Sequence, residues 1–176
     1  MRAEGRDLHG EARLVDALVA RQSRILDAGC GPGRVGGELA QRGHRVVGVD
    51  VDRELIAAAT ANHPDVQWHV RDLSELDLAA EGLARAFDVI ICAGNVMAFL
   101  AEGTAPEVLH RFHQHLAPGG RLVVGFGSGR GYAFDAFLAD ANAAGLRQDA
   151  LFGTWDLRPF TPSSDFLVSL FSRPDD

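Results

Sequence analysis

The chain alternates between short, strongly apolar runs and segments whose apolar positions recur every three or four residues. The apolar runs predict strands over residues 24–28, 45–51, 66–70, 87–92 and 121–125. The amphipathic segments predict helices over residues 35–41, 53–62, 104–116 and 133–144, with a further amphipathic stretch over 11–20. Nearly continuous apolar strands are typical of a parallel sheet that helices cover on both sides. The pattern therefore predicts an α/β fold built as a doubly wound sheet.

The last third of the chain breaks this alternation. Two extended runs, 150–157 and 166–172, are joined by a loop that contains Pro159 and Pro162 and has no room for a helical crossover. Strands joined in this way pair antiparallel, so we expect one antiparallel strand near the C-terminal edge of the sheet. The length of 176 residues fits a single domain, 1–176. We expect an N-terminal helical segment (1–22), a core (23–125), and a terminal helix with a β-hairpin (126–176).

Composition narrows the function classes. The net charge of -7 and the pI near 5.4 disfavour nucleic-acid binding, because such proteins usually present a basic face, so a small-molecule partner is expected. No apolar stretch approaches the roughly 20 residues of a membrane helix, and the charged first residues do not resemble a secretory signal, which predicts a cytoplasmic protein. All 17 basic residues are Arg. Without Lys, Schiff-base chemistry and a Walker phosphate loop are excluded.

A glycine-rich turn, DAGCGPG (27–33), ends the first predicted strand. Glycine tolerates positive φ and lets a ligand touch the backbone, and the free N–H groups of the next helix would hold an anionic group such as a carboxylate or a phosphate. The spacing Gly31-x-Gly33-x-x-Gly36 also matches a dinucleotide fingerprint. The turn alone is therefore compatible with a nicotinamide cofactor as well as with other ligands.

Three carboxylates, Asp27, Asp50 and Asp72, lie at or near the carboxyl ends of three successive predicted strands. Asp27 would repel a pyrophosphate but attract a ligand with an ammonium and a sulfonium, as S-adenosylmethionine has, and it is also placed to accept N–H groups of the turn. Asp50 is expected to accept the ribose hydroxyls, while Asp52 is the better helix cap. Asp72 is placed to accept the adenine amino group, or to cap the segment from Ser74. We expect the three carboxylates to converge on one crevice.

Several segments of the sequence resemble the class I S-adenosylmethionine-dependent methyltransferases. ILDAGCGPG (25–33) is similar to their first motif, GVDVD (48–52) to the acidic end of their second strand, and RDLSEL (71–76) to their adenine-contacting segment. FDVIICAGNVMAFL (87–100) resembles their fourth strand and the following loop, and LHRFHQHLAPGGRLVV (109–124) their helix, turn and fifth strand. The resemblance implies a sheet of order 3-2-1-4-5-7-6 with strand 7 antiparallel. It also implies that residues 23–125 bind S-adenosylmethionine, with S-adenosylhomocysteine as the product.

The resemblance further implies which residues bind the cofactor. Gly29 and Gly31 would pack against its methionine part, and Asp50 would hold the ribose. Cys30 and Cys92 are expected to be reduced thiols. Because the first and fourth strands would be neighbours, both could border the pocket, although simple packing of small residues is the commoner reason for a buried cysteine. The complete expected set comes from the turn, from the ends of strands two and three, and from strand four with its loop: Asp27, Gly29, Cys30, Gly31, Asp50, Val51, Asp72, Leu73, Cys92, Ala93 and Gly94.

The methyl acceptor cannot be identified from the sequence. Methyl transfer is an in-line displacement for which the protein mainly supplies alignment and a dry pocket, so no catalytic residue is assigned. His9, Asn95, Tyr132 and Trp155 are candidates to border the acceptor. Because little of the chain is left to cover a substrate, the site is expected to be open or to be covered by a second subunit of a homodimer.

Two other functions are alternatives to methyl transfer. A short-chain NAD(P) reductase would need Tyr-x-x-x-Lys, whereas the single Tyr132 is followed by AFDAF. Nothing in the sequence excludes a sensor that binds S-adenosylmethionine without transferring its methyl group, and it remains the alternative to methyl transfer. The loop after the fourth strand lacks the Asn/Asp-Pro-Pro-aromatic sequence of enzymes that methylate amino groups of nucleic acids. His110, His113 and His115 lie on a polar helix end where solvated histidines are the commoner case, so no metal is expected.

Overall fold

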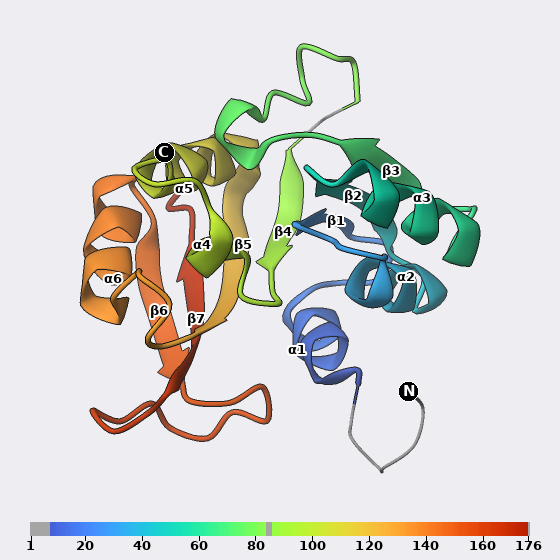
Figure 1. The fold of residues 1–176 in the computed structure, drawn as a ribbon. Helices are drawn as coiled ribbons and strands as arrows, with labels where there is room; N and C mark the ends of the chain where they lie inside the picture. Colours follow the sequence, from blue (N-terminus) through green and yellow to red (C-terminus); the bar gives the residue numbers. More distant parts are fainter. Residues whose placement is uncertain (1–7, 84–85, 176) are drawn as a thin grey trace.

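The structure, a computed structural model, describes residues 8–83 and 86–175 of the chain. Their strands form one seven-stranded sheet of order β3-β2-β1-β4-β5-β7-β6, drawn in Figure 1. β7 runs antiparallel to both neighbours, and every other neighbouring pair is parallel. The expected α/β class, strand order and antiparallel seventh strand are confirmed. The strands are β1 (Arg24–Ala28), β2 (Arg45–Asp50), β3 (Gln67–Val70), β4 (Phe87–Cys92), β5 (Leu116–Gly127), β6 (Arg147–Phe152) and β7 (Phe166–Ser172).

Helices cover both faces of the sheet (Figure 1). One face packs against α1 (Gly10–Leu18), α2 (Arg34–Gln41) and α3 (Arg53–Asn62). The other packs against the 3-10 helix η1 (Leu73–Glu75), α4 (Val96–Phe99), α5 (Ala105–His115) and α6 (Phe134–Ala143). α1 lies inside the expected N-terminal segment, of which residues 1–7 fall outside the described part. Among the described residues, the helices are too short or too polar to cross a lipid bilayer.

Side chains of the central strands point alternately to the two faces of the sheet, so each face has its own apolar core. In β1, Leu26 and Ala28 belong to the cluster beneath α4, α5 and α6, whereas Ile25 belongs to the cluster beneath α1 and α2. All three side chains are fully buried. Successive strand residues point to opposite faces, so Asp27 faces α2 together with Ile25. A slip of one residue would move the Asp27 carboxylate into the apolar core beneath α5, which strongly favours the observed register.

The C-terminal strands differ from the ranges expected from the sequence. β6 spans Arg147–Phe152 rather than 150–157. After it the chain turns back, with the Gly153 N–H donating to the Arg158 carbonyl at 2.8 Å. β5 begins at Leu116 instead of 121, because the chain before 121 already runs beside β4 across a register shift. Apolarity marks residues that pack inward, but it does not distinguish a strand from a loop that folds onto the sheet.

Candidate functional site

The glycine-rich turn after β1 adopts backbone conformations that favour glycine. Gly29, Gly31 and Gly33 have φ values of +73°, +53° and +84°. The N–H groups of Gly29 and Cys30 donate to the Val49 carbonyl at 2.8 and 3.0 Å, which ties the turn to the end of β2. A Cβ on Gly31 would meet no atom within 4 Å. Gly31 therefore exposes its backbone at the carboxyl end of the sheet, where a ligand can approach it closely.

Asp50 ends β2 and holds the same turn through its side chain. One carboxylate oxygen accepts the Gly31 N–H at 2.9 Å, and the other accepts the Asp52 N–H at 2.9 Å. Asp52 caps α3 by accepting two N–H groups of its first turn, as expected. A carboxylate oxygen can accept more than one hydrogen bond, so each Asp50 oxygen keeps acceptor capacity for a ligand. The adjacent Val51 side chain is 69% exposed and offers apolar surface beside the carboxylate.

The segment after β3 places Asp72 near this edge. The Arg71 N–H donates to the Asp50 carbonyl at 2.9 Å, which joins the ends of β2 and β3. The Asp72 carboxylate accepts both the N–H and the hydroxyl of Ser74 at 2.8 Å and so caps η1. The capping alternative for Asp72 is therefore confirmed, and a contact with adenine would use its remaining lone pairs. Leu73 is buried and packs into the core beneath α5.

The loop after β4 approaches the glycine-rich turn from the other side. Cys92 is fully buried, so its side chain belongs to the core and only its backbone can face a ligand. Gly94 has a φ of +71°, and a Cβ on it would meet no atom within 4 Å. Val96, the first residue of α4, packs so closely on Gly29 that a Cβ there would overlap its methyl groups. The turn and the loop thus touch through Val96 and leave an open glycine on each side.

Asp27 differs from Asp50 and Asp72 because it is buried. Its side chain is 2% exposed and lies beneath α2, where it accepts the Gly36 N–H at 2.8 Å. The expectation that it accepts N–H groups is confirmed, although the donor belongs to the helix. Burial raises the pKa of Asp27 to about 7, opposed by the Gly36 N–H and by Arg34 and reinforced by the charge of Asp50. Strand alternation turns Asp27 under the helix, so its convergence with the other two carboxylates on one cofactor site stays a prediction.

The two cysteines pack in different cores, which agrees with the packing alternative. Cys30 packs with Trp68 on the α3 side of the sheet, whereas Cys92 lies in the core beneath α5. Cys30 follows the end of β1 and turns toward β2, where its Sγ lies 3.2 Å from the position of a Cβ on Gly48. Both thiols are free and buried, and burial raises the pKa of each. Strand adjacency alone did not determine which face each side chain takes.

Two candidates for the acceptor site meet near the carboxyl end of β5. The Asn95 Oδ1 atom accepts the Gly127 N–H at 2.8 Å. The Trp155 indole comes from the loop between β6 and β7 and covers Gly125, where a Cβ would overlap the ring. Gly125 and Gly127 lie two residues apart and therefore on one face of the strand. Asn95 and Trp155 are thus brought to the same region.

The other two acceptor candidates lie elsewhere. The Tyr132 hydroxyl donates to the Asp140 carboxylate at 2.7 Å, against α6. Its pKa is raised by burial and by this carboxylate, which makes Tyr132 a poor base. His9 lies at the start of α1, with its Nδ1 atom 3.4 Å from Glu38. Both side chains are explained by these local contacts.

The histidines of α5 also have local roles. His115 accepts the Leu78 N–H at 3.2 Å through Nε2, and its Nδ1 lies 2.7 Å from the Arg111 carbonyl. The Nε2 atom of His110 lies 3.0 Å from the Gln114 amide. Over residues 8–83 and 86–175, no group of three His, Cys, Asp or Glu side chains is arranged to hold a metal ion.

Trp68 is a structural residue that sequence reasoning missed. Its ring lies at 3.0 Å from the Cβ positions of Gly33 and Gly36, and it would overlap a Cβ on Gly48. Its Nε1–H donates to the His63 carbonyl at 3.0 Å. The ring therefore leaves no room for a side chain at Gly48 and makes tight contacts at Gly33 and Gly36, the last glycine of the dinucleotide-like spacing. The available signal was Gly48 inside an apolar strand, a position that often marks close packing.

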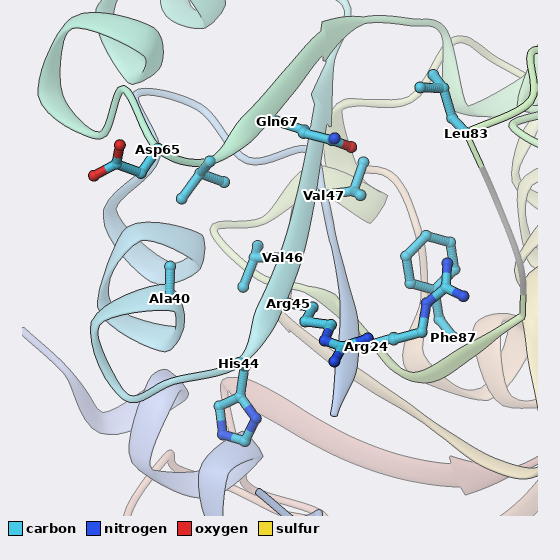
Figure 2. A pocket seen from close by; sticks show the side chains of 11 residues that line it. Arg24, Ala40, His44, Arg45, Val46, Val47, Asp65, Gln67, Leu83 and Phe87 are labelled. Atoms are coloured by element: carbon cyan, nitrogen blue, oxygen red, sulfur yellow. The ribbon is translucent and has the colours of Figure 1, made fainter. Parts of the chain in front are cut away.

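A separate hollow of about 430 Å³ lies at the opposite edge of the sheet. Figure 2 shows its lining, which includes Arg24, Arg45, Gln67 and Phe87. These residues lie at the amino ends of β1 to β4. Ligands of open α/β sheets bind at the carboxyl ends of the strands, so this hollow is distinct from the candidate site.

Comparisons with known sequences point to one family. A model of a methyltransferase domain matches residues 25–120, from β1 into β5. A dTDP-3-amino-3,6-dideoxy-alpha-D-glucopyranose N,N-dimethyltransferase from Streptomyces fradiae is 31% identical over 126 residues, covering 69% of this chain and 48% of the relative. A trans-aconitate 2-methyltransferase from Azoarcus sp. is 36% identical over 123 residues, covering 68% of this chain and 43% of the relative. The chain thus spans less than half the length of these two relatives.

A solved structure matches over almost the whole chain. The TehB-like SAM-dependent methyltransferase from Corynebacterium glutamicum is 46% identical, with a TM-score of 0.91. The match covers 96% of this chain and 90% of the other. It therefore includes the turn, the strand ends and the C-terminal strands together.

Proposed function

This chain belongs to the S-adenosylmethionine-dependent methyltransferases, and on that premise we propose that it transfers the methyl group of S-adenosylmethionine to a small-molecule acceptor. The observation that carries the proposal is the open backbone at the carboxyl edge: Gly31, whose N–H donates to the Asp50 carboxylate, and Gly94 in the loop after β4 both leave their Cβ positions free of neighbouring atoms. The two relatives described above are named for small-molecule acceptors, an amino sugar nucleotide and trans-aconitate, which supports the same class here.

The residues of the crevice fit the cofactor. Asp50 has lone pairs for the ribose hydroxyls, and exposed Val51 offers apolar surface for the adenine. The open backbone at Gly31 and Gly94 suits the methionine part. Five members of the expected set are buried, and their side chains would act through packing or charge: Asp27, Cys30, Leu73, Cys92 and Ala93. The proposed binding set is Asp27, Gly29, Cys30, Gly31, Asp50, Val51, Asp72, Leu73, Cys92, Ala93 and Gly94.

The protein's part in the reaction is binding and alignment. When bound, the cofactor supplies a methyl group on a positively charged sulfur. The carboxylates of Asp50 and, when ionised, Asp27 favour a positively charged ligand at this edge. The contact of Val96 with Gly29 holds the loop after β4 against the turn, which keeps the two walls of the crevice in a fixed relation. Such alignment contributes several kcal/mol to a displacement reaction.

The proposal also covers the protein's domain organisation, its location in the cell and its oligomeric state. We propose a single-domain cytoplasmic enzyme that does not act on nucleic acid and whose site is either open or covered by a second copy in a homodimer. One sheet that contains strands from residue 24 to residue 172 supports the single domain. The two buried free thiols support a reducing compartment, and the net charge of -7 disfavours a nucleic-acid substrate.

Thermal stability with added ligands tests the proposal. S-adenosylhomocysteine and S-adenosylmethionine are expected to raise the melting temperature, whereas NADPH is not, because binding to the folded state stabilises it. Transfer of labelled methyl groups to a panel of small acceptors then tests turnover. Stabilisation by NADPH alone contradicts the cofactor. Tight binding of S-adenosylhomocysteine without transfer to any acceptor would instead favour a sensor.

A further inference from the structure

The carboxyl end of β5 forms a notch beside the proposed cofactor crevice. Gly127 is the next residue on the face of β5 where Trp155 covers Gly125, and no side chain packs on it as closely as Trp155 does on Gly125. A Cβ on Gly127 would lie 3.5 Å from the Asn95 Oδ1 atom and 3.7 Å from the Arg130 Nε atom. We define the β5 notch by Gly127, Asn95, Arg130 and Trp155. It has an aromatic ring on one side and polar donors on the other.

Arg130 brings an uncompensated positive charge to the β5 notch. Its guanidinium lies over the Phe99 ring, 5.7 Å from the ring centre, and Phe99 is 69% exposed. Within the described part of the chain this is its one specific contact, and no carboxylate pairs with it. A guanidinium stacked on an aromatic ring keeps its N–H donors in its own plane and available for a ligand. Arg130 is therefore held in place without being neutralised.

Carboxylates on the Trp155 side of the notch are already paired. Trp155 also borders a cavity of about 410 Å³ that contains Glu11 and Asp156. Glu11 lies 2.6 Å from Arg34, and Asp156 lies 3.4 Å from Arg158. These pairs lower the negative potential that an anionic ligand would meet on that side.

The acidic residues on the far side of Arg130 form no ion pair with it. Glu102 and Asp140 line the same cavity as Arg130, and Asp140 accepts the Tyr132 hydroxyl. The Asp165 carbonyl also borders Gly127, but it already accepts the Ser128 N–H at 2.8 Å. The donors in the notch are the Arg130 guanidinium and the Asn95 amide NH2 group; the Asn95 oxygen already accepts the Gly127 N–H.

We propose that the β5 notch holds the methyl acceptor and that this acceptor carries an anionic oxygen group, a carboxylate or a phosphate, bound by Arg130. The inference rests on the proposed function. Asn95 directly follows Gly94, whose open side faces the crevice, so an acceptor anchored here lies next to the proposed methionine site. In the reaction, the acceptor's nucleophilic atom bonds to the methyl carbon as the carbon–sulfur bond breaks. S-adenosylhomocysteine leaves as a neutral thioether, and the acceptor's proton passes to water.

Calorimetric titration of the protein saturated with S-adenosylhomocysteine tests this proposal. The probes are benzoate, phenyl phosphate, benzamide and benzylamine, and the two anions distinguish a carboxylate from a phosphate. At least one anion is expected to bind roughly tenfold more tightly than both other probes. Arg130→Gln should abolish that preference. The matched control Arg147→Gln, an exposed arginine at the opposite edge in β6, should keep it.

Gly127→Ala provides a second test that leaves the charge unchanged. The φ of Gly127 is not positive, and the nearest atoms would make ordinary contacts with the added methyl group, so the variant should fold. It is expected to weaken anion binding by filling the notch. Equal affinity for all probes, preference for benzylamine, no probe binding, or a preference that survives Arg130→Gln overturns the acceptor site. Failure to bind S-adenosylhomocysteine overturns the proposed function as well.

Discussion

Asp50 and Asp52 lie two residues apart at the end of β2 and have different partners. Asp50 supports the turn at Gly31, whereas Asp52 caps α3. We predict that Asp50→Ala lowers the affinity for S-adenosylhomocysteine by at least roughly tenfold, because the ribose acceptor and the support of the turn are lost together. Asp52→Ala should cost about 1 kcal/mol of stability and keep the affinity. Calorimetry and urea unfolding measure both, and equal affinities of wild type and Asp50→Ala would contradict the ribose role.

Burial of Asp27 gives the stability of the protein a definite pH dependence. Its pKa in the folded state, about 7, lies above the ordinary value of 3.8, so the folded chain holds this proton more tightly. The associated stabilisation is present below about pH 4 and is lost as the pH rises through about 7. We predict that the free energy of unfolding of wild type, relative to Asp27→Asn, falls by roughly 3 kcal/mol over that range. Urea unfolding across pH measures it; parallel curves would refute the shift.

At the scale of elements, Trp68 sets the spacing of β2, β3 and α2. Its ring fills the space that side chains on Gly36 and Gly48 would need. We predict that Gly48→Ala destabilises the protein by about 1–3 kcal/mol, because the buried ring cannot move away freely. Adding Trp68→Leu should recover part of that loss. A double-mutant cycle in urea measures the coupling, and strict additivity would show that the two sites do not interact.

The short helices near the site could not be predicted from the periodicity of apolar residues. α4 has four residues and η1 has three, so neither is long enough for apolar positions to recur and mark a helix. The contact of Val96 with Gly29 joins residues 67 positions apart, and only the assembled sheet brings them together. The position of β6 likewise depends on its pairing with β7. Local patterns located most strands, while long-range contacts decided how the loops between them meet.

At the scale of the whole molecule, the two cysteines lie on opposite faces of the sheet. Cys30 and Cys92 are buried in different cores. We predict that both thiols react with iodoacetamide only through global unfolding, and therefore at equal rates in native buffer. S-adenosylhomocysteine should slow both reactions, because it stabilises the folded state. Mass spectrometry of the alkylated peptides measures this, and faster labelling of one cysteine would reveal local opening instead.

Sheet order could be predicted, because the order of the motifs along the chain fixes it. Asp50 was assigned at a strand end, and the structure places it there with its helix-capping neighbour Asp52. The surroundings of Asp27 and the two cysteines could not be predicted, because the face that a side chain takes depends on alternation and on the helix above it. Arg130 carries no motif at all. Its position over Phe99 exists only once the loops after β4 and β5 are folded.

The chain contains two tryptophans, and they stand at opposite sides of the carboxyl edge. Trp68 touches Gly33 in the turn, and Trp155 covers Gly125 beside the β5 notch. Their ultraviolet emission thus provides two built-in optical reporters, one beside the proposed cofactor site and one beside the proposed acceptor site. With Trp155→Phe the remaining signal belongs to the cofactor side, so the order in which the two ligands arrive becomes measurable by stopped-flow mixing without any attached dye.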